Sequence, residues 1–222
     1  MNKDTIQKAL ETALKGKGSK KFTQSVEAVF NFRNVDTAKP ENRLNLDVVL
    51  PKGRGKKVPV VVFAEQQQAL DAQKAGAEKV FSNADIQKMA ADKKEIRQLA
   101  KTCEFIAAPN MMINVGKSLG QVLGAKNRLP RPITGQVADA VKQAEARVRL
   151  ASRGKYLPTV SCSIGSEAMS VADLAENFDA VYEKVKGKVV ESNIASIYVK
   201  LSMGPAVRAD VSASKEEAAN SS

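Results

Sequence analysis

The hydrophobic pattern of the strand-like segments changes twice along this 222-residue chain. Near both ends, at 26–32, 44–50 and 196–202, apolar and polar residues alternate, which is typical of antiparallel strands with one buried face. In the middle, residues 59–64 (PVVVFA) are continuously apolar, which is typical of a parallel strand buried on both faces. The pattern therefore predicts two kinds of sheet, one built from the chain ends and one from the middle.

Strand-like and helical segments alternate through the middle region. In chain order they lie at 59–64, 66–75, 79–81, 85–101, 104–108 and 109–123. This alternation predicts βαβ units with right-handed crossovers, and so a small α/β domain. We place that domain at 58–154.

The two chain ends share the alternating strand pattern, and each also carries an amphipathic helical segment. The simplest interpretation is one discontinuous α+β domain, with two layers and a mostly antiparallel sheet, formed by 1–57 and 155–222. The α/β domain is inserted into it, flanked by the basic linkers 51–57 (PKGRGKK) and 148–155 (VRLASRGK). The polar tail, about 212–222, is expected to be disordered.

The charge balance predicts a polyanionic partner. The chain has 35 Lys and Arg against 24 Asp and Glu, a net charge of +11. It has no apolar run near the ~20 residues that span a bilayer, and its first residues lack the apolar core of a signal peptide. Nucleic acid and a cytoplasmic location are therefore expected. Aromatic residues make up 5% of the chain, so polar groups on a sheet surface are favoured over stacked aromatic platforms.

The residue types exclude most catalytic chemistry. Without histidine, mechanisms that use Ser-His, Cys-His or His-metal pairs are ruled out. Cys103 and Cys162 lie in apolar, strand-like runs, which predicts buried reduced thiols rather than a disulfide or a zinc site. The GKS segment at 116–118 lacks the phosphate-loop glycine, because Met111 occupies that position. We expect no catalytic residues, no cofactor and no metal.

Basic clusters recur in glycine-containing segments of the chain. Lys20 and Lys21 follow the stretch KGKGS, and other clusters lie in the two linkers and in the loop 124–135. One charge run is usually a solvated surface, but several in a chain of net charge +11 favour contacts with phosphates. This interpretation is favoured most for Lys20 and Lys21.

The segment SMGP at 202–205 directly follows the last alternating strand. Glycine and proline at a strand end often form nothing more than a turn. Alternatively the segment contacts RNA, because Gly204 allows close backbone approach and Met203 offers an adaptable apolar surface. The residues by themselves leave both interpretations open.

Four segments resemble a known family in their order along the chain. They are KKFTQSVE at 20–27, LPKGRGK at 50–56, GKSLGQVLG with LPRP within 116–132, and SIYVKLSMGP at 196–205. Together they resemble the lateral-stalk protein family of the large ribosomal subunit, ribosomal protein L-one, in its archaeal type. The serine/threonine-Met-Gly-Pro motif after a strand is the most specific part.

The resemblance implies a discontinuous RNA-binding domain with an inserted Rossmann-like domain. It implies three RNA partners: the stalk of large-subunit ribosomal RNA, the exit-site tRNA whose release such proteins influence, and the protein's own messenger, bound in its leader or coding region and repressed. We expect a monomer off the ribosome, with no membrane partner.

The resemblance also implies which residues contact RNA. They are Lys20, Lys21, Phe22, Ser25, Glu27, Lys155, Ser196, Ser202, Met203 and Gly204. Ser25 and Ser202 stand where the family usually has threonine, so the hydroxyl is kept. Ala125 and Lys126 replace a common Pro-Arg pair, which leaves the role of that loop open.

Two other functions compete with this assignment. An enzyme acting on an anionic substrate would place its site at the carboxyl ends of the inserted strands, at 65–66, 82–83 and 109–110. A generic basic binder would not prefer RNA, and its binding would fall steeply with salt.

Overall fold

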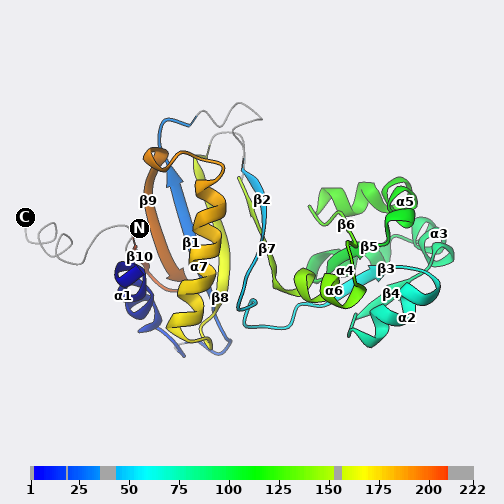
Figure 1. Cartoon of the computed structure of the whole chain (residues 1–222), viewed down its shortest axis with the longest axis horizontal. Coiled ribbons are helices and arrows are strands. Elements are labelled where there is room, and N and C mark those ends of the chain that lie inside the picture. Colours follow the sequence, from blue (N-terminus) through cyan, green and yellow to red (C-terminus); the bar gives the residue numbers. More distant parts are fainter. Residues whose placement is uncertain (1–2, 19, 36–43, 153–156, 210–222) are drawn as a thin grey trace, which may run out of the picture. The chain divides into compact units, whose positions relative to one another are not determined.

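The computed structural model describes residues 3–18, 20–35, 44–152 and 157–209. The chain divides into two compact units, Met1–Lys56 with Arg147–Ser222 and Lys57–Ala146 (Figure 1). From the sequence we placed the second boundary at 154, but Arg147–Ala151 forms strand β7 of the first unit. The reason is that β7 pairs along its whole length with β2, Asn45–Val49. The predicted disordered tail lies outside the described residues.

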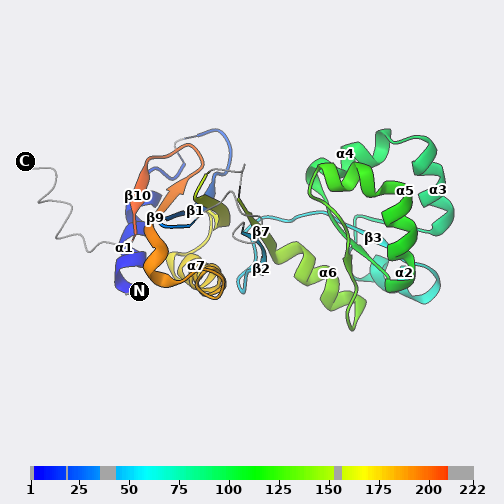
Figure 2. The same ribbon diagram turned by 90° about the horizontal axis from the view of Figure 1, so that it is seen from above.

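The first unit contains a four-stranded antiparallel sheet in the order β10-β9-β1-β8. Its strands are β1 (Ser25–Phe32), β8 (Thr159–Ser166), β9 (Ile194–Leu201) and β10 (Ala206–Arg208). Helices α1 (Lys3–Leu14) and α7 (Val171–Lys186) pack against one face of this sheet, as two views show (Figures 1 and 2). A short 3₁₀ helix, Glu191–Asn193, leads into β9. The unit is thus a mixed helix-and-sheet fold, as the alternating pattern predicts.

The two N-terminal strands do not pair with each other. β1 lies between β8 and β9, whereas β2 forms a separate two-stranded ribbon with β7. Both strands have an alternating pattern, which fixes the buried face of a strand but not its neighbour. The two strands share one hydrophobic core, because Phe30 of β1 and Val48 of β2 belong to the same buried cluster. In this cluster Phe30 stacks on Phe178 of α7, with ring centroids 5.9 Å apart.

The second unit contains a parallel sheet in the order β4-β3-β5-β6. Its strands are β3 (Val60–Phe63), β4 (Lys79–Phe81), β5 (Glu104–Ala107) and β6 (Arg131–Pro132). Its helices are α2 (Gln66–Lys74), α3 (Asn83–Ala91), α4 (Lys94–Thr102), α5 (Met112–Ala125), which follows a 3₁₀ turn at Pro109–Met111, and α6 (Val137–Ala146). Every residue of β3 is buried, with separate apolar clusters on its two faces, so the predicted two-sided burial is confirmed.

Two local features of the second unit refine the prediction. The single helical segment expected at 85–101 is two helices, because Asp92 is extended and its carboxylate accepts the Lys94 N–H at 3.0 Å, which starts a new helix. The GKS segment lies inside α5, so it is not a phosphate loop.

Both cysteines are free and buried, as predicted. Burial raises the pKa of the Cys162 thiol to about 12, with a smaller contribution from the negative charge of Glu27. We expect the Cys103→Ser variant, which isolates Cys162, to react with iodoacetamide at pH 8 roughly 1000-fold more slowly than a free thiol, because the thiolate is the reactive form. Mass spectrometry of the native and denatured protein measures this, and equal rates in the two states would contradict it.

Candidate nucleic-acid interface

Five of the predicted contact residues meet at one end of the antiparallel sheet, where β1 begins and β9 ends. The Ser202 N–H donates to the Ser25 carbonyl oxygen at 3.0 Å. The Ser202 hydroxyl lies 3.2 Å from that same oxygen and 3.2 Å from Glu27 Oε1. Met203 and Gly204 follow directly, and we call these five residues the sheet-end cluster.

A tight turn presents Met203 to solvent. The Gly204 N–H donates to the Leu201 carbonyl oxygen at 3.0 Å, which closes the turn. A Cβ added at Gly204 would lie 3.1 Å from Leu201 Cβ, so a larger residue would crowd this turn. Met203 is 65% exposed, and exposed apolar residues that gather in a patch often mark an interaction site.

Lys20, Lys21 and Phe22 lie in the exposed segment that leads into β1. Phe22 is 55% exposed, so two large apolar side chains, Phe22 and Met203, are exposed in the segments that flank the start of β1 and the end of β9. Lys20 and Lys21 add two positive charges to the exposed segment that carries Phe22.

Ser196 does not join the sheet-end cluster. It lies six residues before Ser202 in the chain, and at the spacing of an extended strand this places it roughly 20 Å away. Its side chain shares the less buried face of β9 with Tyr198 and Lys200. The Ser196 hydroxyl accepts from Asn31 Nδ2 at 3.0 Å, and Asn31 Oδ1 accepts from the Thr159 hydroxyl at 2.9 Å. Lys155 lies outside the described residues.

The basic linker 51–57 is fixed beside the sheet-end cluster by Asn177 of α7. The Asn177 side chain is fully buried, accepts the Lys52 N–H at 3.0 Å, and donates to the carbonyl oxygens of Gly53 at 2.9 Å and Ile164 at 2.8 Å. Lys56 Nζ then lies 3.5 Å from the Ser25 hydroxyl. From the sequence we expected a boundary linker with a basic cluster that favours phosphate contacts, but not its attachment to Asn177 or the contact of Lys56 with Ser25.

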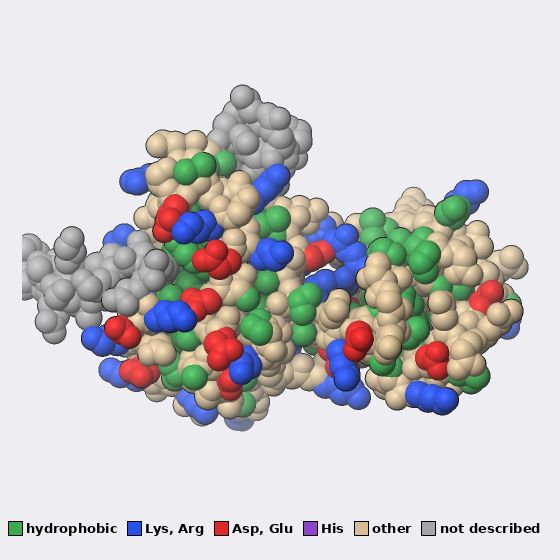
Figure 3. All heavy atoms as spheres, in the orientation of Figure 1, with side chains coloured by type: hydrophobic (Ala, Val, Ile, Leu, Met, Phe, Trp, Pro, Cys, Tyr) green, Lys and Arg blue, Asp and Glu red, His purple; other side chains and the backbone are tan. Residues whose placement is uncertain are grey.

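The helical face of the first unit has a different electrostatic character. Figure 3 shows acidic and basic side chains intermixed over α1 and α7. Several of them pair: Lys52 lies 3.4 Å from Glu176, and Lys3 lies 4.0 Å from Asp179. Such mixed surfaces have little net attraction for a polyanion, which leaves the opposite face and the sheet end as the better RNA surface.

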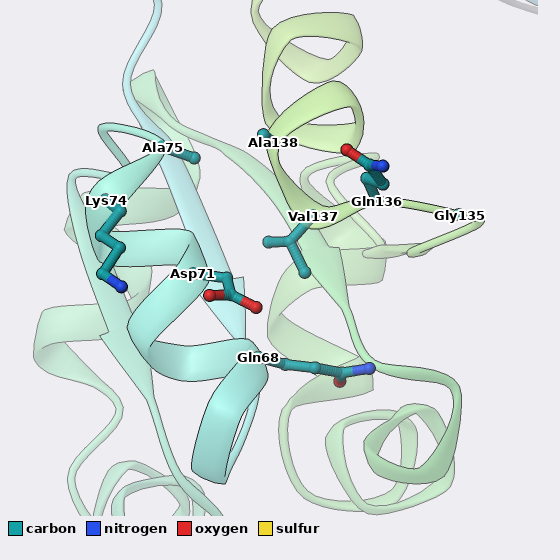
Figure 4. Close-up of a pocket in the computed structure, with 8 residues that line it drawn as sticks. All are labelled: Gln68, Asp71, Lys74, Ala75, Gly135, Gln136, Val137 and Ala138. Atoms are coloured by element: carbon teal, nitrogen blue, oxygen red, sulfur yellow. The ribbon is translucent and has the colours of Figure 1, made fainter.

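Two surface depressions of the second unit each have a volume of about 470 Å³. One lies between α2 and the first turn of α6, where Asp71 points toward Val137 (Figure 4). The other lies at the carboxyl ends of β3 and β5 and is lined by Glu65, three glutamines, Pro109 and Asn110.

Neither depression has the chemistry that the enzyme alternative needs. In the depression at the strand ends, Glu65 is the one ionisable side chain, and its Oε1 accepts the Asn83 N–H at 3.2 Å. The other depression holds one acid and one lysine on the open surface of α2. Among the described residues, no group of three acidic, cysteine or histidine side chains could hold a metal, and no helix has the length and apolarity to cross a membrane.

Comparison with known proteins gives a consistent result over nearly the whole chain. The model of the ribosomal protein L1p/L10e family matches residues 10–205. The large ribosomal subunit protein uL1 of Methanocella arvoryzae is 37% identical over 209 residues, which cover 93% of this chain and 98% of that protein. The uL1 proteins of Archaeoglobus fulgidus and Pyrococcus horikoshii are each 38% identical, and the matches cover 94% and 92% of this chain and 98% and 96% of theirs.

Proposed function

The chain belongs to the ribosomal protein L1p/L10e family, in its archaeal type, and we propose that its sheet-end cluster binds a helical stalk of large-subunit ribosomal RNA. Members of this family are structural proteins of the large ribosomal subunit and take part in translation in the cytoplasm. Membership therefore decides against the enzyme alternative.

The observation that carries the proposal is the arrangement around Ser202. Its hydroxyl lies within 3.2 Å of both the Ser25 carbonyl oxygen and Glu27 Oε1, next to the exposed Met203. Hydroxyl and carboxylate groups at such a site can exchange hydrogen bonds with ribose 2′-hydroxyls, which DNA lacks. The neighbouring apolar side chains exclude water from these bonds, and this strengthens them.

Three lysines supply the attraction for phosphates. Lys20 and Lys21 precede β1, and Lys56 is held against Ser25. Glu27 does not suit a phosphate, so it is assigned to a 2′-hydroxyl or a base amine. Ser196, six residues away on the same face of β9, would contact a separate part of the RNA helix.

Two further activities are proposed for the same RNA surface. A segment of the protein's own messenger that copies the stalk would compete for the sheet-end cluster, so binding there would repress translation. Holding the stalk beside the exit site would influence release of deacylated tRNA. We also infer that Lys57–Ala146 is the Rossmann-like insert, because β3 and β5 are parallel neighbours whose crossovers lead to opposite edges of the sheet.

The proposal is tested by titrating the protein with a stalk RNA fragment and with duplex DNA of equal charge over a salt series. We expect RNA to bind far more tightly at moderate salt, because 2′-hydroxyl and apolar contacts do not depend on counterion release. Equal affinities that fall together with salt would favour the generic basic binder instead.

Lys21→Ala should weaken RNA binding and lower the slope of log affinity against log salt by roughly one, because one phosphate contact releases about one counterion. The matched control is Lys3→Ala, since Lys3 lies on α1, which covers the other face of the sheet. If both substitutions change the slope equally, Lys21 has no specific contact.

A further inference from the structure

Gln24 is a buried polar residue that none of the RNA contacts explains. It directly precedes β1, and its side chain is 1% exposed. A buried side-chain amide is unfavourable unless both of its ends are hydrogen-bonded. The partners of Gln24 therefore indicate why this position carries an amide.

The Gln24 side chain joins two turns that follow different strands. Its Oε1 accepts the Met203 N–H at 3.1 Å, in the turn after β9. Its Nε2 donates to Glu167 Oε2 at 3.3 Å, in the turn after β8. The Gln24 backbone oxygen also accepts the Glu167 N–H at 2.9 Å, so the two residues are held together twice.

These two partners require different chemistry from one side chain. The Met203 N–H is a donor and needs an acceptor, whereas the Glu167 carboxylate only accepts and needs a donor. A glutamine meets both needs in one orientation, and its two partners fix that orientation. An apolar residue of the same length would meet neither.

We propose, on the basis of the RNA-binding function above, that Gln24 is a positioning residue that fixes the Met203 turn in its RNA-binding conformation. Gln24 is too buried to touch RNA, so it acts through the backbone of Met203. Without this bond the turn has more conformations in the free protein. Binding must then order it, which lowers the affinity without removing a contact.

A reciprocal exchange of the two side chains tests this mechanism. Gln24→Glu removes the donor to Glu167 and places two carboxylates together. Their repulsion displaces the side chain at position 24 from the Met203 N–H, so RNA affinity should fall about tenfold, the effect of one buried hydrogen bond. Glu167→Gln should bind nearly as the parent does, because its amide oxygen still accepts from Gln24. The double variant Gln24→Glu/Glu167→Gln should regain most of the affinity. In it, the new amide at position 167 can donate to one oxygen of the new carboxylate at position 24, while the other oxygen accepts the Met203 N–H.

Three readouts separate positioning from loss of folding. Gln24→Met should also lose about tenfold in RNA affinity, while its salt slope stays unchanged because no phosphate contact is lost. Hydrogen exchange at the Met203 amide, measured without RNA, should accelerate in Gln24→Glu and Gln24→Met and slow again in the double variant. Thermal unfolding of every variant shows whether the unit remains folded.

The outcomes also separate this inference from the proposed function. If the unsubstituted protein shows no preference for RNA, the proposed function fails, and the exchange data still report on the bond. If it prefers RNA but Gln24→Met binds equally well, or the double variant binds no better than Gln24→Glu, the positioning role is wrong.

Discussion

Met203→Asp should weaken binding to the stalk RNA by about 100-fold or more while the protein stays folded, because a like charge facing phosphates costs several kcal/mol. Met203 is 65% exposed in the structure, so replacing it removes little buried surface and should change the unfolding temperature little. The change replaces an apolar contact with a carboxylate in the middle of the proposed interface. Affinity for RNA at a fixed salt concentration and thermal unfolding together measure the result.

The matched control for this substitution is Ile113→Asp. Ile113 is 66% exposed on α5 of the second unit, so the change adds the same charge at the same exposure. It should lower RNA affinity only slightly, through the change in net charge. If both variants lose affinity equally, the effect of Met203 is general electrostatics and the sheet-end cluster is not the binding site.

Asn177→Leu should destabilise the first unit by about 2–3 kcal/mol and also weaken RNA binding. The side chain forms three hydrogen bonds to the backbone, two of them to the basic linker, and leucine of similar size forms none. The Ile164 carbonyl oxygen would lose its Asn177 partner, in a buried bond. For a chain of this size, the unfolding temperature should fall by roughly 5–10 °C.

The affinity loss follows from the position of the linker. Once Asn177 no longer holds Lys52 and Gly53, Lys56 is not fixed beside Ser25, and its phosphate contact must be ordered on binding. Lys56→Ala should show the affinity loss without the stability loss, because Lys56 is exposed. Asn114→Leu, which removes a single exposed hydrogen bond to Asn83, is the control for replacing an amide by leucine. Unchanged RNA affinity in Asn177→Leu would show that the linker takes no part in binding.

Much of the fold follows from local patterns in the sequence. The alternation of apolar and polar residues in 26–32 and 196–202 reflects strands with one buried face. The continuous apolar run at 59–64 reflects a strand with two buried faces, because burial decides which side chains a strand tolerates. The break between α3 and α4 was missed, since a single aspartate that restarts a helix leaves the hydrophobic period almost unchanged.

Some residues of the candidate site could be named from the sequence, and others could not. A motif and a resemblance were enough to name Ser202, Met203 and Gly204. Gln24 and Asn177 gave no signal, because a glutamine or asparagine in a sequence is most often an exposed polar residue. Their roles depend on partners far away in the chain: Gln24 bonds Met203 across 179 positions, and Asn177 bonds Lys52 across 125.

The sequence by itself determined the two kinds of sheet, the buried cysteines, the positive charge and the motif that identifies the family. These are properties of single residues and short periods. Only the tertiary structure decided that β2 pairs with β7, that Ser25 and Ser202 meet while Ser196 lies apart, and that the basic linker is held against the cluster. The physical reason is that strand pairing and buried hydrogen bonds join distant segments, and their energies depend on which groups the whole fold brings together.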